Sequence, residues 1–194
     1  MTYSEVDLAA TAVAAWLQQR AGISRGDRVA VMMPNIFAFP VAMLGIQKAG
    51  AAQVNVNPLY TPHELRHQLQ DSGAETIIIF SGSTSTLTEI VEETPIKTVI
   101  TVALGDASEV VVPTPLQDPR LEGAIRFADV LKEGAHLELS PVELTGDDLL
   151  FFQYTGGTTG PSKGALLSHR NLVANIQQFT AHMREAVEPA RKLS

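Results

Sequence analysis

Short apolar segments alternate with segments of helical periodicity along residues 1–104, and this alternation limits the possible folds more than any other feature. Strands that lack a polar face need cover on both sides of their sheet. Helices that connect successive strands supply this cover and make neighbouring strands parallel. The sequence therefore predicts an α/β fold with a mainly parallel sheet and helices on both faces. The predicted strands are residues 28–33, 51–56, 76–80 and 98–102.

Capping residues and glycines mark the ends of the predicted helices. Thr61 is followed by Pro62 and by Glu64 three residues on, which is the pattern of a capping box. Gly73 suits the C-terminal end of the same helix. Ser4 is the predicted N-cap of the first helix. The predicted helices are residues 5–20, 36–48, 62–71 and 85–93.

The chain divides into three parts by its composition. Residues 1–104 form the α/β unit, residues 105–146 contain several prolines in a polar stretch, and residues 147–194 return to the earlier pattern. We predict that the middle part is an irregular excursion followed by a short helix. The elements predicted after residue 104 are a helix at 127–132, strands at 148–153 and 165–168, and a helix from 170 to 184.

The overall composition excludes several classes of function. The 194 residues carry 14 Lys and Arg against 21 Asp and Glu, a net charge of −7, and no Cys. An acidic chain argues against nucleic acid as a partner. The absence of Cys excludes thiolate catalysis and Cys-ligated zinc. Residues 29–46 carry no charge, but Pro34 and Pro40 interrupt this segment, so it predicts a strand and a helix rather than a membrane span.

Residues 154–164 are the segment with the clearest chemical content. They read Tyr-Thr-Gly-Gly-Thr-Thr-Gly-Pro-Ser-Lys-Gly and lie between two predicted strands. Glycines let backbone N–H groups converge on an anion, Thr hydroxyls donate, and Lys163 supplies a cation, so the segment suits a polyphosphate. Its spacing matches neither a Walker A loop nor a dinucleotide fingerprint. The alternative is a glycine-rich hairpin that binds no ligand.

The same segment and its flanks resemble the AMP-forming adenylating enzymes, and bacterial long-chain fatty acid CoA ligases most of all. The similarity runs from the first residues to about residue 175. Unlike the usual loop of that family, this one has Ser162 next to Lys163 and its proline one place earlier, at Pro161. The further stretches that carry the resemblance are residues 2–5, 26–30, 54–62, 64–65, 71–74, 152–154 and 167–172.

The resemblance implies a reaction in two steps. A fatty acid carboxylate attacks ATP to give acyl-adenylate and pyrophosphate, and coenzyme A then displaces AMP. ATP, Mg²⁺ and coenzyme A are the implied cofactors and co-substrates. Lys163, Thr158 and Thr159 are the implied catalytic residues, as donors to the phosphates. The implied nucleotide-binding residues are Tyr154, Thr155, Gly156, Gly157, Thr158, Thr159, Gly160, Lys163 and Gly164.

The resemblance also implies that residues 1–194 are an incomplete N-terminal domain, since the family's other active-site motifs follow this loop. We therefore expect the chain alone to be inactive, and to self-associate through surfaces that the rest of the protein would cover. The full-length enzyme would be cytoplasmic, with peripheral contact to the inner membrane as an option. The alternative is a nucleotide-binding or interaction module that functions by itself, without ligase activity.

One further motif needs an explanation. Residues 63–67 read His-Glu-Leu-Arg-His, which fits the H-E-x-x-H pattern of zinc metalloproteases. The capping box at Thr61 and Glu64 explains part of this pattern without a metal. A third ligand at His136, Glu138 or His169 would follow no spacing of that class. A zinc site is therefore the remote alternative.

Overall fold

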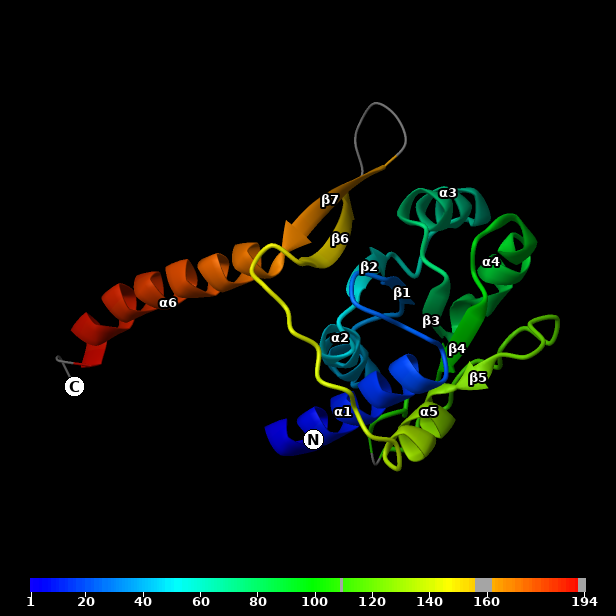
Figure 1. Ribbon diagram of the computed structural model, residues 1–194, viewed down its shortest axis with the longest axis horizontal. Coiled ribbons are helices and arrows are strands. Elements are labelled where there is room, and N and C mark those ends of the chain that lie inside the picture. The colour runs from blue at the N-terminus through cyan, green and yellow to red at the C-terminus, as the bar shows by residue number, and fades with distance from the viewer. Residues whose placement is uncertain (109, 156–161, 192–194) are drawn as a thin grey trace.

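The computed structural model describes residues 1–108, 110–155 and 162–191. Its centre is a seven-stranded sheet in the order β5-β4-β3-β1-β2-β6-β7 (Figure 1). All neighbouring strands are parallel except β6 and β7, which are antiparallel. This confirms the predicted α/β fold. The strands are β1 Arg28–Met32, β2 Ala52–Val56, β3 Thr76–Phe80, β4 Thr98–Val102, β5 Ile125–Arg126, β6 Leu149–Thr155 and β7 Lys163–Ser168.

Helices cover both faces of the sheet, each over its own hydrophobic core (Figure 1). On one face α1, α2 and α5 bury Leu17, Ile46 and Phe127 against β1, β3 and β4. On the other face α3 and α4 bury Leu69 and Leu87. The helices are α1 Tyr3–Gln19, α2 Ala38–Lys48, α3 Pro62–Ser72, α4 Thr84–Thr88, α5 Phe127–Gly134 and α6 His169–Arg191, with 3-10 turns η1 Ser81–Ser83 and η2 Val91–Glu93.

The first helix begins earlier than predicted, because its N-cap is Thr2 and not Ser4. The Thr2 hydroxyl accepts a hydrogen bond from the Glu5 amide at 3.3 Å, and the Glu5 carboxylate accepts one from the Thr2 amide at 2.6 Å. This reciprocal pair requires Ser or Thr, followed three residues later by Glu or Gln. Ser4 has Asp7 at that distance, so the prediction at Ser4 was wrong.

Two elements after β3 also differ from the prediction. The helix predicted at residues 85–93 is broken into α4 and η2. The Thr88 hydroxyl donates to the Thr84 carbonyl at 3.0 Å, and side-chain bonds of this kind weaken a helix. The two-residue strand β5 was not predicted because it is too short to show periodicity. Between β4 and β5 the described residues contain no helix or strand.

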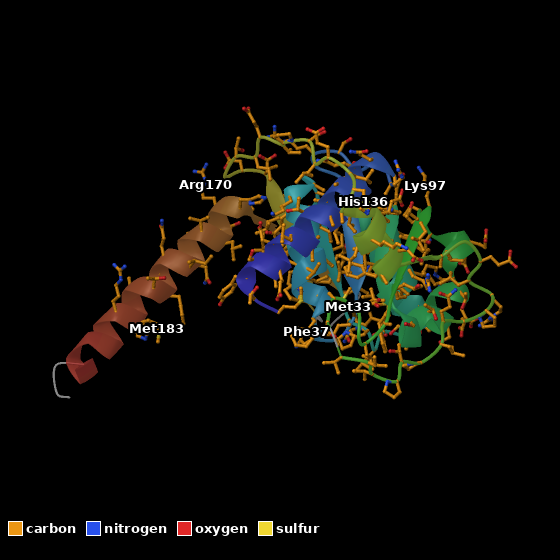
Figure 2. The ribbon with its side chains drawn as sticks, turned by 90° about the horizontal axis from the view of Figure 1, so that it is seen from below. Met33, Phe37, Lys97, His136, Arg170 and Met183 are labelled. Carbon is orange, nitrogen blue, oxygen red and sulfur yellow. The ribbon has the colours of Figure 1, made fainter. Side chains whose placement is uncertain are left out.

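The last part of the chain forms the hairpin of β6 and β7, which completes the sheet, and the helix α6 that follows it. Strand β6 pairs with β2, so both strands end at the same edge. Helix α6 then extends away from the body, with Arg170 near its base and Met183 towards its far end (Figure 2). Within the described residues no helix is long and apolar enough to cross a bilayer. Peripheral membrane contact stays a prediction.

Candidate functional site

The structure places the described residues of the predicted phosphate loop at the closed end of the β6–β7 hairpin, where the loop joins the two strands. Thr155 pairs with Lys163, and Tyr154 pairs with Gly164. The predicted residues Gly156, Gly157, Thr158, Thr159 and Gly160 lie outside the described residues. The loop thus leaves and rejoins the sheet at one antiparallel pair, as the prediction of two flanking strands requires.

Tyr154 faces the core under α3 rather than solvent. Its side chain is buried, and its hydroxyl donates a 2.6 Å hydrogen bond to Oδ2 of Asp71. Burial, together with this hydrogen bond to a carboxylate, raises the pKa of the Tyr154 phenol well above its ordinary value. The phenol therefore stays protonated, and Tyr154 fixes the end of β6 in place.

Gly164 gives the Tyr154 ring room on the opposite strand. A Cβ atom at position 164 would lie 3.0 Å from Cζ of Tyr154 and 3.1 Å from its Cε2. Carbon atoms in ordinary contact are about 3.5–4.0 Å apart. A residue larger than glycine would push against a ring that is held by the core and by Asp71. The glycine thus has a packing role in addition to the nucleotide-binding role implied by the resemblance.

Lys163 and Thr155 are the two predicted site residues that present their side chains to solvent at the hairpin. Both are exposed and face each other across the antiparallel pair. Among the described residues no carboxylate forms an ion pair with Lys163. The Lys163 side chain therefore stands exposed at the start of β7, next to the predicted phosphate loop.

Hydrogen bonds between side-chain amides join β2 to β6, the strand that leads into the loop. Nδ2 of Asn55 donates to Oε1 of Gln153 at 2.7 Å, and Nε2 of Gln53 donates to Oδ1 of Asn55 at 2.5 Å. From α3, Nε2 of Gln68 donates to the Asn55 carbonyl at 2.6 Å. No role was predicted for these side chains, although Asn55 and Gln153 lie in the stretches that carry the resemblance. The signal was present, because Gln53 and Asn55 interrupt an otherwise apolar strand.

The H-E-x-x-H segment lies in α3, and its first half is occupied by helix capping. The Glu64 carboxylate accepts from the Thr61 amide at 2.8 Å, and the Thr61 hydroxyl accepts from the Glu64 amide at 3.4 Å. The hydrogen bond from the Thr61 backbone lowers the pKa of Glu64. This confirms the predicted capping box. In the part of the chain that the structure describes, no three His, Asp or Glu residues gather as metal ligands would.

His67 has a contact of a different kind. Its Nε2 lies 3.1 Å from the carbonyl oxygen of Ser162, the residue before Lys163. A carbonyl oxygen only accepts, so Nε2 carries the proton in this bond. The second histidine of the motif therefore touches the backbone of the predicted phosphate loop.

A separate depression of about 610 Å³ lies between the start of α2 and the segment after β4. It is lined mainly by apolar side chains, among them Ile36, Phe39, Leu104 and the exposed Phe37 (Figure 2). None of the described residues that line it is charged. The depression therefore does not suit a phosphate group, and the hairpin remains the candidate site.

The fold and the hairpin together define the N-terminal domain of adenylate-forming acyl-CoA ligases. The structure of a long-chain-fatty-acid CoA ligase from Archaeoglobus fulgidus matches 92% of this chain and 32% of its own, with a TM-score of 0.74 and 28% sequence identity. The N-terminal domain of a Mycobacterium tuberculosis protein, solved with an inhibitor, matches 87% of this chain and 37% of its own, with a TM-score of 0.64 and 31% identity.

The chain belongs to the AMP-binding enzyme family, whose sequence model matches residues 1–192. It is 43% identical to the long-chain-fatty-acid–CoA ligase of Salmonella typhimurium over 204 residues, which cover 100% of this chain and 36% of the relative. The ligase of the same description from Bacillus subtilis is 33% identical, also over 100% of this chain and 36% of its own. The chain thus spans about a third of the length of these relatives. The resemblance stated from the sequence is confirmed.

Proposed function

We propose that this chain supplies the ATP-phosphate-binding loop of an AMP-forming long-chain fatty acid CoA ligase. In the first step an oxygen of the fatty acid carboxylate attacks the α-phosphorus of ATP, and the bond to the β-phosphate breaks to release pyrophosphate. In the second step the sulfur of coenzyme A attacks the acyl carbon, and AMP leaves. The observation that carries the proposal is the hairpin, which sets Thr155 and Lys163 opposite each other at the two ends of a Gly/Thr-rich loop.

The role of each loop residue follows from the charge that develops on the leaving pyrophosphate. Preorganised donors aimed at that charge lower the barrier. The Lys163 ammonium group is exposed at the start of β7, where it can follow the β- and γ-phosphates. The hydroxyls of Thr158 and Thr159 and the loop amides would donate to the same oxygens. Among the described residues no three His, Asp or Glu side chains gather, and Mg²⁺ is usually held by one or two carboxylates together with the phosphates of the substrate.

Titration with ATP tests the role of the loop. We expect Lys163→Ala to weaken ATP binding by about 10- to 100-fold, as expected for the loss of a hydrogen bond to a charged group. The matched control is Lys132→Ala, which removes the same charge from an exposed position on α5. Equal affinities of both variants for ATP, measured by calorimetry, would count against a phosphate-binding role of Lys163.

The second part of the proposal is that the chain alone does not complete the reaction. It spans 36% of the length of the ligases it matches. We expect no AMP release from ATP, fatty acid and coenzyme A above the rate without protein. Release that requires both fatty acid and coenzyme A would refute this part. ATP binding that depends on Lys163 and is as tight in this chain alone as in a full-length ligase would favour the alternative of a nucleotide-binding module that functions by itself, whereas much weaker binding fits part of a larger site.

A further inference from the structure

The C-terminal half of α3 contacts both ends of the phosphate loop. His67 reaches the Ser162 carbonyl at 3.1 Å, and Asp71 accepts from the Tyr154 hydroxyl at 2.6 Å. Residues four apart lie on the same face of a helix, one turn above the other. Tyr154 precedes the loop and Ser162 follows it, so one face of one helix holds the two points where the loop joins the sheet.

We propose that His67 and Asp71 are positioning residues that fix the ends of the phosphate loop from α3. A role of these two residues in the reaction rests on the proposed function, because it requires that the loop binds the phosphates of ATP. The contacts themselves do not depend on any nucleotide.

Helix α3 is well suited to act as a fixed support. Its capping box and Pro62 define its start, and Gly73 in the left-handed conformation, at φ 63°, defines its end. Leu65 and Leu69 are fully buried in the core beneath it. A helix with both ends capped and two fully buried leucines moves little relative to the sheet. Its polar side chains can therefore hold other segments at defined positions.

A third contact ties the same helix to the strand next to β6. Nε2 of the fully buried Gln68 donates to the Asn55 carbonyl of β2 at 2.6 Å. Strand β2 in turn pairs with β6, with Asn55 opposite Gln153. Helix α3, strand β2 and the hairpin thus form one connected unit, and the two loop contacts extend this unit to the edge of the sheet.

The two contacts act on different parts of the loop. The hydrogen bond that Tyr154 donates to Asp71 holds a ring that also packs against Gly164, so it fixes the closed end of the hairpin on both strands. The bond from His67 holds the carbonyl immediately before Lys163. Because the backbone at residue 162 sets the direction in which residue 163 leaves the loop, His67 orients the cation without touching its side chain.

The inference also explains the part of the H-E-x-x-H pattern that capping leaves open. Capping accounts for Glu64, and His63 is exposed. His67 is half-buried, and its Nε2 is engaged by a backbone carbonyl. His67 therefore acts together with Asp71, four residues after it, and not with His63, four residues before it.

Hydrogen–deuterium exchange of the amides of Tyr154, Thr155 and residues 162–164, measured without nucleotide, tests the inference. We expect His67→Ala to raise their exchange by about fivefold, which corresponds to about 1 kcal/mol for one lost hydrogen bond. His67→Gln, whose amide can still donate, should restore most of the protection. The matched control is His63→Ala on the exposed side of the same helix, which should leave the exchange unchanged.

The Asp71 contact has its own set of variants. Asp71→Ala and Tyr154→Phe should raise the exchange of the same amides by similar factors. The double variant should exchange little faster than either single variant, because both substitutions remove the same hydrogen bond. Asp71→Asn keeps an acceptor and should restore protection. Protection of the β1 amides in every variant would show that the fold is intact. Unchanged exchange in both His67→Ala and Asp71→Ala, or an equal rise in His63→Ala, would overturn the inference.

The measurement separates this inference from the proposed function. If ATP binds without any dependence on Lys163 while the exchange responds as expected, the positioning holds and the phosphate role fails. If ATP binding depends on Lys163 and the exchange does not respond to His67 or Asp71, the reverse is true. If both hold, His67→Ala should weaken ATP binding and His67→Gln should recover it, which a general loss of stability would not produce.

Discussion

Gly164, which the resemblance places in the phosphate loop, also has a role in packing. Its missing side chain leaves space for the Tyr154 ring, which the core and Asp71 hold from the other side. We expect Gly164→Ala to lower the free energy of unfolding by about 1–2 kcal/mol, because the ring has to shift in a packed site. Urea unfolding followed by the fluorescence of Trp16, the chain's one tryptophan, measures this.

The control for this prediction removes the ring. In a Tyr154→Ala background the same Gly164→Ala substitution has nothing to collide with, so its cost should fall towards zero. If the cost is the same in both backgrounds, the contact between the ring and position 164 is not its cause.

The ion pair between Arg25 and Asp148 joins two elements that are far apart in the sequence. Nε and one terminal nitrogen of Arg25 donate to the two carboxylate oxygens of Asp148, each at 2.8 Å. Arg25 lies just before β1 and Asp148 just before β6. The hydrogen bonds from Arg25, followed by those from Thr145, hold the pKa of Asp148 well below its ordinary value. The pair therefore helps to place the strand that leads into the loop.

Because folding lowers the pKa of Asp148, the stabilisation is present above the pKa of the unfolded state and is lost as the pH falls towards that of the folded state. We expect the urea concentration at the unfolding midpoint of the wild type to decrease once the pH is below about 4. Asp148→Asn should lower this midpoint at pH 7, and the midpoints of the two proteins should become equal in acid. Glu138→Gln, at an exposed site, is the control. A constant difference between wild type and Asp148→Asn from pH 7 to acid would contradict the assignment.

Secondary-structure elements were predictable where one pattern dominates a segment. Strands β1 to β4 and β6 are apolar runs, and the ends of α3 follow from Thr61, Pro62 and Gly73. The start of α1 was wrong because two capping residues compete near the N-terminus, and β5 was missed because two residues carry no period. These errors are local: β5 adds one short strand at the edge of the sheet, and none of them alters the hairpin of β6 and β7.

The candidate site was predictable only in part, for a physical reason. The composition of residues 154–164 predicts a phosphate loop, because the chemistry of glycine, threonine and lysine can be recognised from a short segment alone. The contacts that hold the loop come from His67 and Asp71, which are 95 and 83 residues away from their partners. Contacts of this kind depend on which helix lies over which strand. The sequence shows His67 only as part of a pattern that suggested a metal.

At the scale of the whole molecule, the outer surface of the hairpin and of α6 is unusually apolar. Strand β7 is the edge of the sheet, and its Leu166 is 55% exposed. On α6, which extends away from the body, Val173 and Ile176 are each 53% exposed and Phe179 is 64% exposed (Figures 1 and 2). Their spacing of three residues places them along one side of the helix. An exposed edge strand next to an apolar helix face favours association.

We therefore expect the chain to self-associate as its concentration rises from micromolar to millimolar, which sedimentation velocity or light scattering measures. Replacing Ile176 and Phe179 together by Gln should shift association to higher concentration, since it removes apolar area from the middle of the helix face. Leu59→Gln is the matched control, because Leu59 is equally apolar and highly exposed but lies between β2 and α3. A monomer throughout the range, or an equal shift with Leu59→Gln, would show that the α6 face does not drive association.

The dependence on salt is a further test. The net charge of −7 on each copy opposes association by electrostatic repulsion, and salt screens this repulsion. Added salt should therefore strengthen the association if the apolar face is its cause.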